Sequence, residues 1–231
     1  MNRNLCIIPA RGGSKRIPRK NIKDFLGKPI IAYSIKVALD SGLFDEVMVS
    51  TDDAEIAEVA LLCGAKVPFL RSEANANDFA TTADVLKEVL QQYAALGQHF
   101  DLACCIYATA PLIKGSRLIE GHRLLVDKSA DTVFPVTKFS FPITRALKLE
   151  NQKLAMMWPE NLNKRSQDLP TAYHDAGQWY WFKTEQLLQS GKLLTDNTFG
   201  LELPEIEVQD IDNHSDWKLA EFKYAYLQSL T

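Results

Sequence analysis

The stretch NLCIIPARGGSKRIPRKN, residues 4–21, joins an apolar run to a turn that contains two glycines and many cations. A short apolar run bounded by turn residues is typical of a strand buried on both faces of a sheet. The cations of the turn are Arg11, Lys15, Arg16, Arg19 and Lys20. Ligands of open α/β sheets bind beyond the carboxyl ends of the strands, so this position predicts a local anion.

Strand-like and helix-like segments alternate along the next part of the chain. The expected strands are 46–51, 67–70, 101–109 and 132–137, and the expected helices are 30–42, 53–64, 82–97 and 116–128. Asp53 and Thr81 stand where helix N-caps are needed. This alternation predicts β-α-β units and an α/β fold with a mainly parallel, doubly wound nucleotide-binding sheet.

Between residues 140 and 170 the pattern changes to two short strand-like runs and a polar stretch. We interpret this segment as a hairpin excursion that meets a second subunit, which predicts a homodimer. The chain returns at 175–183, where alternating aromatic residues predict a buried strand. Residues 207–210 are interpreted as a further strand, before an acid-rich turn and a closing helix. The whole chain, 1–231, is therefore expected to be one domain with an excursion at 140–170.

The composition restricts the classes of function. Lys and Arg number 26 against 29 Asp and Glu, and the formal net charge is −3. This balance lacks the electrostatic footprint of a general nucleic-acid-binding protein. Neither a secretory leader pattern nor an apolar run of about 20 residues, as a membrane span requires, is found. We therefore expect a cytoplasmic protein with no nucleic-acid or membrane partner.

The basic turn has neither the Walker A pattern nor the dinucleotide pattern G-x-G-x-x-G. The stretch IIPARGGSKRIPRKN, residues 7–21, instead resembles the signature of the CMP-sugar synthetases, cytidylyltransferases that activate sialic acids and related acids with CTP. The resemblance implies a nucleotide-binding α/β domain with a dimerisation excursion. It also implies that this turn binds the nucleotide through Arg11, Gly12, Gly13, Ser14, Lys15, Lys20 and Asn21.

The segment LRSEANANDFATTADV, residues 70–85, resembles the second nucleotide segment of the same family. In that family an arginine near its start and a hydroxyl residue after D-x-A lie near the cytidine. The resemblance therefore places Arg71 and Thr82 beside the base or ribose. Thr81 is interpreted as an N-cap.

Asp210 and Asp212 are two residues apart, so in an extended segment both carboxylates point to the same side. Two hard oxygen ligands suit Mg²⁺, although acids near a helix start also favour the helix dipole without any metal. The matching D-x-D of the family binds the metal, so the resemblance implies Mg²⁺ here. The implied reaction is attack of the sugar's anomeric hydroxyl on the α-phosphorus of CTP, with pyrophosphate leaving. Asp212 is implied to remove the proton, directly or through a metal-bound water, while Arg11, Lys15 and Lys20 complete the catalytic group.

The segment 163–181, NKRSQDLPTAYHDAGQWYW, resembles the part of the family that lines the sugar pocket. Arg165 stands where a guanidinium would hold the sugar carboxylate by a two-point fork. The runs IYATAPL and YHDAGQWYW resemble the branch of the family that acts on pseudaminic acid. The residues implied to read the sugar substituents are His174, Asp175, Gln178 and Tyr107.

The implied substrates are thus CTP and a nine-carbon 2-keto sugar acid, with pseudaminic acid as the leading candidate. One alternative is a cytidylyltransferase for N-acetylneuraminic, legionaminic or another ulosonic acid. A second is a non-catalytic, nucleotide-binding regulatory protein. Measuring which acid yields a CMP-sugar distinguishes these three possible functions.

Overall fold

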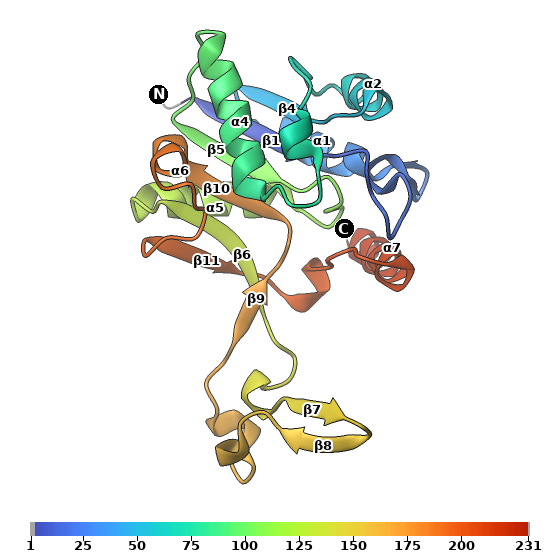
Figure 1. Ribbon diagram of the computed structural model, residues 1–231, viewed down its shortest axis with the longest axis vertical. Coiled ribbons are helices and arrows are strands. Elements are labelled where there is room, and N and C mark those ends of the chain that lie inside the picture. The colour runs from blue at the N-terminus through green and yellow to red at the C-terminus, as the bar shows by residue number, and fades with distance from the viewer. Residues whose placement is uncertain (1–2, 231) are drawn as a thin grey trace.

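The computed structural model describes residues 3–230 as a helix-covered sheet from which a slender arm projects (Figure 1). The strands are β1 (Asn4–Pro9), β2 (Asp24–Phe25), β3 (Lys28–Pro29), β4 (Glu46–Ser50), β5 (Leu102–Ile106), β6 (Thr132–Lys138), β7 (Leu147–Glu150), β8 (Lys153–Met156), β9 (Tyr173–Asp175), β10 (Trp179–Lys183) and β11 (Thr198–Glu202). The α-helices are α1 (Ile30–Asp40), α2 (Ala54–Leu62), α3 (Glu73–Ala76), α4 (Thr82–Ala95), α5 (Gly115–Asp127), α6 (Thr184–Ser190) and α7 (His214–Ser229). None of these helices has both the length and the apolar character that a membrane span needs.

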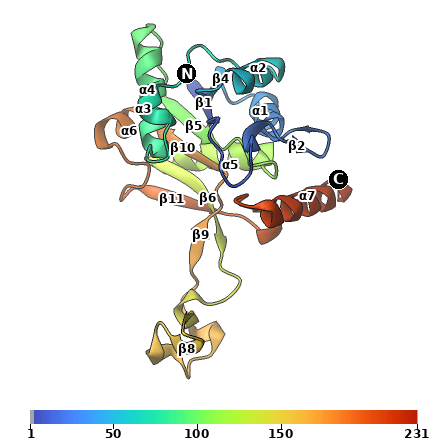
Figure 2. The same cartoon turned by 45° about the vertical axis from the view of Figure 1, so that its right-hand side comes forward.

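The central sheet has the order β11-β6-β10-β5-β1-β4, and β9 pairs with β6 off this path. β1 is parallel to β4 and β5, and β11 is parallel to β6. β10 lies antiparallel between β5 and β6. Helices α4 and α6 cover one face, whereas α1 and α5 cover the other (Figure 2). The predicted mainly parallel, doubly wound α/β sheet is therefore confirmed.

The core is divided by the alternation of side chains along each central strand. In β10, Trp179 and Trp181 pack in the cluster under α1 and α5, while Tyr180 and Phe182 pack in the cluster under α4 and α6. β1 distributes its apolar residues in the same way. Burying one large apolar side chain contributes about 1.5–3 kcal/mol. Both faces thus hold these strands in register and fix the position of the loops at their ends.

Three expected strands differ from the structure. Residues 67–70 form no strand, because Pro68 has no N–H to donate to a ladder, and only Lys66 makes an isolated bridge. No strand forms at 207–210, because Glu207 ends the 3₁₀ turn Glu205–Glu207 and residues 208–210 are irregular. The strand expected at 175–183 divides into β9 and β10 around Gly177, whose φ of +63° turns the chain.

The arm leaves the sheet after β6 and returns in β9 (Figure 1). Its two ends lie side by side, since the Phe139 amide donates to the Ala172 carbonyl over 3.1 Å. Within residues 3–230, β7 and β8 pair only with each other. Leu147, Leu149 and Leu154 of this hairpin are 56%, 67% and 64% exposed. The predicted hairpin excursion is present, and its role in assembly stays a prediction.

Candidate active site

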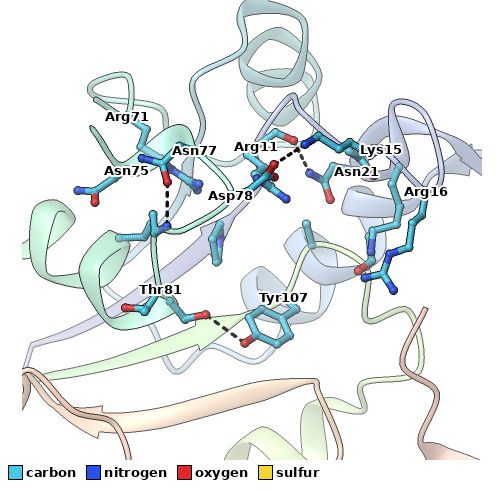
Figure 3. Close-up of a pocket in the computed structure, with 18 of the residues that line it drawn as sticks. Arg11, Lys15, Arg16, Asn21, Arg71, Asn75, Asn77, Asp78, Thr81 and Tyr107 are labelled. Carbon is cyan, nitrogen blue, oxygen red and sulfur yellow. Dashed lines mark hydrogen bonds and ion pairs between the residues drawn. The ribbon is translucent and has the colours of Figure 1, made fainter. Parts of the chain in front are cut away.

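A pocket of about 580 Å³ opens at the carboxyl ends of β1 and β5, a volume in the usual range for small-molecule sites (Figure 3). Three segments supply most of its lining: the basic loop (residues 11–20), the second segment (residues 71–82) and the acid pair (Asp210 and Asp212). The pocket brings together the predicted residues Arg11, Ser14, Lys15, Lys20, Asn21, Arg71, Thr82, Tyr107, Asp210 and Asp212. Segments distant in the sequence therefore meet at the edge of the sheet where a ligand was expected.

The basic loop is fixed to the start of α2 near both of its ends. The Gly12 amide donates to Asp52 over 3.0 Å, and Arg19 donates to both oxygens of Asp53 over 2.5 and 3.0 Å. A Cβ at Gly12 would lie 2.7 Å from Oδ2 of Asp53, so this close approach requires glycine. Asp53 also caps α2 as predicted, by accepting from the Ile56 amide. The hydrogen bonds from Arg19 lower the pKa of Asp53 to about 2.

The second half of the basic loop also contacts the segment that carries the acid pair. Lys20 Nζ donates to the Ile211 carbonyl over 2.8 Å, and Arg16 forms an ion pair with Asp212 at 2.6 Å. Burial lowers the pKa of Lys20, while the charges of Asp212 and Asp210 act in the opposite direction. Lys20 and Arg16 thus hold the acid-pair segment, which precedes α7, in contact with the basic loop.

The acid pair is held by the start of α7. Asp216 belongs to a capping box with Asn213, and its carboxylate also accepts from the Asp212 amide over 2.9 Å. The pKa of Asp210 is raised first by desolvation of its carboxylate and then by the charge of Asp212. Both carboxylates reach the same pocket, in agreement with the spacing argument.

The donor set of the acid pair fits one kind of metal. Within residues 3–230, no group of three or more His, Cys, Asp or Glu side chains is arranged to hold a metal ion. Two carboxylates beside a cationic loop do match Mg²⁺, which takes one or two carboxylates and completes its shell with water and substrate phosphate. The chemistry of the residues present is therefore compatible with Mg²⁺ delivered together with a nucleotide.

The second segment contributes a fixed cation and a hydroxyl group. Arg71 is buried, and its guanidinium donates to the Ser50 carbonyl over 2.6 Å and to the Ser50 hydroxyl over 3.1 Å. Burial lowers the pKa of Arg71. The hydroxyl groups of Thr82 and Tyr107 lie 3.2 Å apart in the pocket wall. Thr81 completes a capping box at the start of α4, as its predicted N-cap role requires.

Arg165 and His174 lie outside the pocket lining, as the described residues define it. Arg165 belongs to the arm, where its side chain is exposed and paired with Asp168 at 2.8 Å. His174 is an exposed residue of β9, and its ring packs on Phe139 with the centroids 4.8 Å apart. Both of these predicted sugar-binding residues therefore sit on the arm or at its base.

Asp175 and Gln178 also lie outside the lining, although they are closer to the acid pair. Asp175 accepts from the Gly177 amide over 2.7 Å and from the Tyr180 hydroxyl over 2.5 Å. The Gln178 amide is buried and donates to the backbone carbonyl of Glu207 over 2.5 Å. A Cβ at Gly177 would lie 3.7 Å from Cγ of Asp210, so this turn borders the acid pair.

Six polar lining residues were not among the predicted site residues: Arg16, Asn75, Asn77, Asp78, Thr81 and Thr109. Asp78 accepts from Arg11 Nη1 and from Lys15 Nζ, each over 2.5 Å. Asn75, Asn77 and Asp78 lie inside the segment 70–85 that carries the second resemblance. A single sequence does not indicate which polar residues of such a loop turn inward.

Comparisons with known proteins bear on this pocket. Residues 5–191 match a protein-family model described as cytidylyltransferase. A pseudaminic acid cytidylyltransferase of Campylobacter jejuni is 44% identical over 223 residues, which are 96% of each chain. A CMP-N,N'-diacetyllegionaminic acid synthase of Legionella pneumophila is 33% identical over 224 residues, which are 95% of each chain.

One solved structure with the same fold is a CMP:2-keto-3-deoxy-manno-octonic acid synthetase complexed with CTP. It matches with a TM-score of 0.69 over 98% of this chain and 99% of that chain. The sequence identity is 18%, so this likeness concerns the fold alone.

Proposed function

Because this chain belongs to the cytidylyltransferase family, we propose that it transfers the cytidylyl group of CTP to pseudaminic acid and releases pyrophosphate. It is an enzyme, a nucleotidyltransferase whose product is CMP-pseudaminic acid. The observation that carries this conclusion is the 44% identity, over 96% of both chains, with a pseudaminic acid cytidylyltransferase. The meeting of the basic loop and the acid pair in one pocket supports it.

We propose that the basic loop binds the phosphates of CTP. Arg11, Ser14 and Lys15 line the pocket with charged or hydroxyl groups, and Lys20 lies between them and the acid pair. Their task is to bring a polyphosphate next to a sugar carboxylate. At an effective dielectric constant of 20, two like charges 4 Å apart repel by about 4 kcal/mol.

Three further residues are proposed to contact the nucleoside. Asn21 donates to the Arg11 carbonyl over 2.9 Å and lines the pocket at the end of the basic loop. Arg71 and Thr82 lie in the second segment. Gly12 and Gly13 are proposed to let the loop backbone approach the phosphates, and the Gly12 amide is already used by Asp52.

We propose that Asp210 and Asp212 hold Mg²⁺, which would lower the charge on the α-phosphate and help to ionise the attacking hydroxyl. Asp212 is also our candidate for accepting the proton of the anomeric hydroxyl. Its amide is fixed by Asp216 and its carboxylate by Arg16, so the group has a defined direction into the pocket. Asp210 faces the same space beside the Gly177 turn.

The sugar side is proposed to include Arg165, His174, Asp175, Gln178 and Tyr107. Of these described residues, Tyr107 alone lines the pocket. We propose that the arm, residues 140–170, completes the sugar side within a homodimer. The exposure of Phe141, at 83%, and of the hairpin leucines supports an interface on the arm. Sedimentation analysis of the wild type and of Phe141→Asp tests this assembly.

A cytoplasmic location is also proposed, because an enzyme that consumes CTP needs access to the nucleotide pool. Fractionation of cells that produce the protein tests this part separately.

The decisive experiment offers the purified protein CTP, Mg²⁺ and one acid at a time. The acids are pseudaminic, legionaminic, N-acetylneuraminic and deoxy-octulosonic acid. Pyrophosphate is followed continuously, and the nucleotide-sugars are weighed by mass spectrometry. A CMP adduct of pseudaminic acid is expected. If only another acid forms an adduct, the proposed reaction stands but pseudaminic acid is not the substrate. Nucleotide binding without any release of pyrophosphate would indicate a non-catalytic protein.

A further inference from the structure

Asp78 bridges two cations of the basic loop, Arg11 and Lys15. Its Oδ1 accepts from Arg11 and its Oδ2 from Lys15, each over 2.5 Å (Figure 3). All three side chains line the same pocket. Two of the cations that are proposed to bind polyphosphate thus share a single carboxylate.

The local backbone presents Asp78 to these cations. Oδ1 of Asn77 accepts from the amides of Phe79 and Ala80, over 2.7 and 3.0 Å, which folds the chain into a tight turn around Asp78. Thr81 then begins α4 with a capping box. Asp78 therefore stands between two fixed points, and its side chain reaches the cations in the pocket.

A carboxylate and a phosphate require the same donors. Each presents anionic oxygens to Arg as a fork and to Lys as a point charge. We infer that Asp78 competes with the phosphates of the nucleotide and of pyrophosphate for Arg11 and Lys15. The inference rests on the proposed function, since it assumes that this pocket receives a polyphosphate.

The ion pairs of Asp78 with Arg11 and Lys15 are exposed, so breaking them costs little free energy. The side chains of Arg11, Lys15 and Asp78 are 38%, 79% and 42% exposed, and exposed ion pairs contribute little to stability. A polyphosphate can therefore displace Asp78 without a large loss. Arg71 is the contrast, because it is buried and held by the Ser50 backbone rather than by an acid.

The competition affects product release as well as binding. After the cytidylyl group is transferred, the leaving pyrophosphate keeps its contacts with the two cations until another anion takes them. Asp78 is tethered within reach of both, so it acts at a high effective concentration. Its return favours the departure of pyrophosphate and weakens product inhibition.

The test measures binding directly, so that it does not depend on turnover. Calorimetry in EDTA compares pyrophosphate, CTP and cytidine on the wild type, Asp78→Asn and Asp78→Glu. Asp78→Asn is expected to bind pyrophosphate and CTP about three- to tenfold more tightly, because two exposed ion pairs are lost as competitors. Cytidine binding should stay unchanged, and Asp78→Glu should resemble the wild type.

The matched control is Asp40→Asn, which removes the same charge from an exposed ion pair with Lys36 on α1, outside this pocket. Unchanged or weaker pyrophosphate binding by Asp78→Asn would overturn the inference, as would equal tightening by Asp40→Asn. A wild type that binds no CTP would instead count against the proposed function. Slower pyrophosphate dissociation from Asp78→Asn, measured by stopped flow, would support the proposed role in release.

Discussion

The nucleotide side and the sugar side of this protein are built differently. On the nucleotide side, the basic loop, the second segment and the acid pair converge on one pocket at the edge of the sheet. On the sugar side, Arg165 and His174 lie on the arm or at its base, exposed and outside that pocket. Under our proposal, one chain supplies most of the nucleotide site, whereas the sugar site depends on how the arm is used.

The largest expected effect concerns the acid pair, where the two sides meet. Asp212→Asn should lower kcat about 100-fold or more, because metal-assisted charge stabilisation contributes several kcal/mol to such reactions. The affinity for cytidine should change little. Pyrophosphate release at saturating CTP and Mg²⁺ measures the effect. Asp127→Asn, an exposed carboxylate at the end of α5, is the control, and near-normal turnover of Asp212→Asn would contradict our assignment.

A second prediction tests whether the sugar side crosses between subunits. Arg165→Ala should raise the KM for the sugar acid about 10- to 100-fold, since a buried charge pair with a substrate carboxylate is lost on truncation. The dissociation constant of CTP should not change. Lys164→Ala removes a neighbouring exposed cation and serves as the control.

Mixed dimers sharpen this test. If Arg165 acts on the partner's pocket, Arg165→Ala and Asp212→Asn subunits should regain activity together at a low sugar concentration. Each variant then supplies the group that the other lacks. Absence of any recovery in confirmed heterodimers would place Arg165 in the site of its own chain.

A third prediction concerns the rigidity of the nucleotide side. Gly12→Ala should destabilise the protein by about 1–3 kcal/mol and weaken CTP binding, because its Cβ would lie 2.7 Å from Asp53. Gly13→Ala is a close control, since a Cβ there would meet no heavy atom of the described residues within 4 Å. Urea denaturation and calorimetry separate the two variants. Equal stability and equal CTP affinity of the two variants would show that the loop tolerates displacement from α2.

The smallest expected effect is the pH dependence of the Arg19–Asp53 pair. The pKa of Asp53 is about 2 in the folded protein, below its ordinary value of about 3.9 in an unfolded chain. The pair therefore stabilises the fold above pH 4, and its contribution disappears as the pH falls toward 2. Solvent screening reduces it to about 1 kcal/mol.

Asp53→Asn isolates this contribution, because asparagine also serves as an N-cap and keeps the start of α2. The variant should be less stable than the wild type at pH 7, and the difference should fall to about half at pH 3, where Asp53 is still mostly ionised in the folded protein. Urea denaturation at both pH values gives the comparison. A difference that persists unchanged at pH 3 would assign the effect to packing rather than to charge.

The meeting of the basic loop and the second segment in one pocket could be predicted, because each segment is contiguous in the sequence and the basic loop follows a recognisable buried strand. The pocket contains most of the residues that the two resembling segments supplied. The partner of Arg11 and Lys15 could not be predicted, because Asp78 reaches them only through the tertiary fold. The strand expected at 207–210 does not form either, because Glu207 ends a 3₁₀ turn and residues 208–210 are irregular.

The sugar side was less predictable because its candidates depend on backbone turns and on assembly. Gly177 separates β9 from β10, so Asp175 and Gln178 face different surroundings, although a single strand was expected there. Gln178 is committed to the Glu207 carbonyl. A resemblance in sequence identifies such residues, but it does not indicate which neighbouring groups already form hydrogen bonds with them.

The pairing of β6 with β9 has a consequence for protein engineering. Lys138 and Tyr173 are partners in this ladder, and the Phe139 amide bonds to Ala172, so the chain enters and leaves the arm at one point. Everything between these positions can be exchanged as a cassette while the sheet keeps its register. Evolution has the same freedom: the arm can diversify toward new acids while the machinery for CTP is inherited intact.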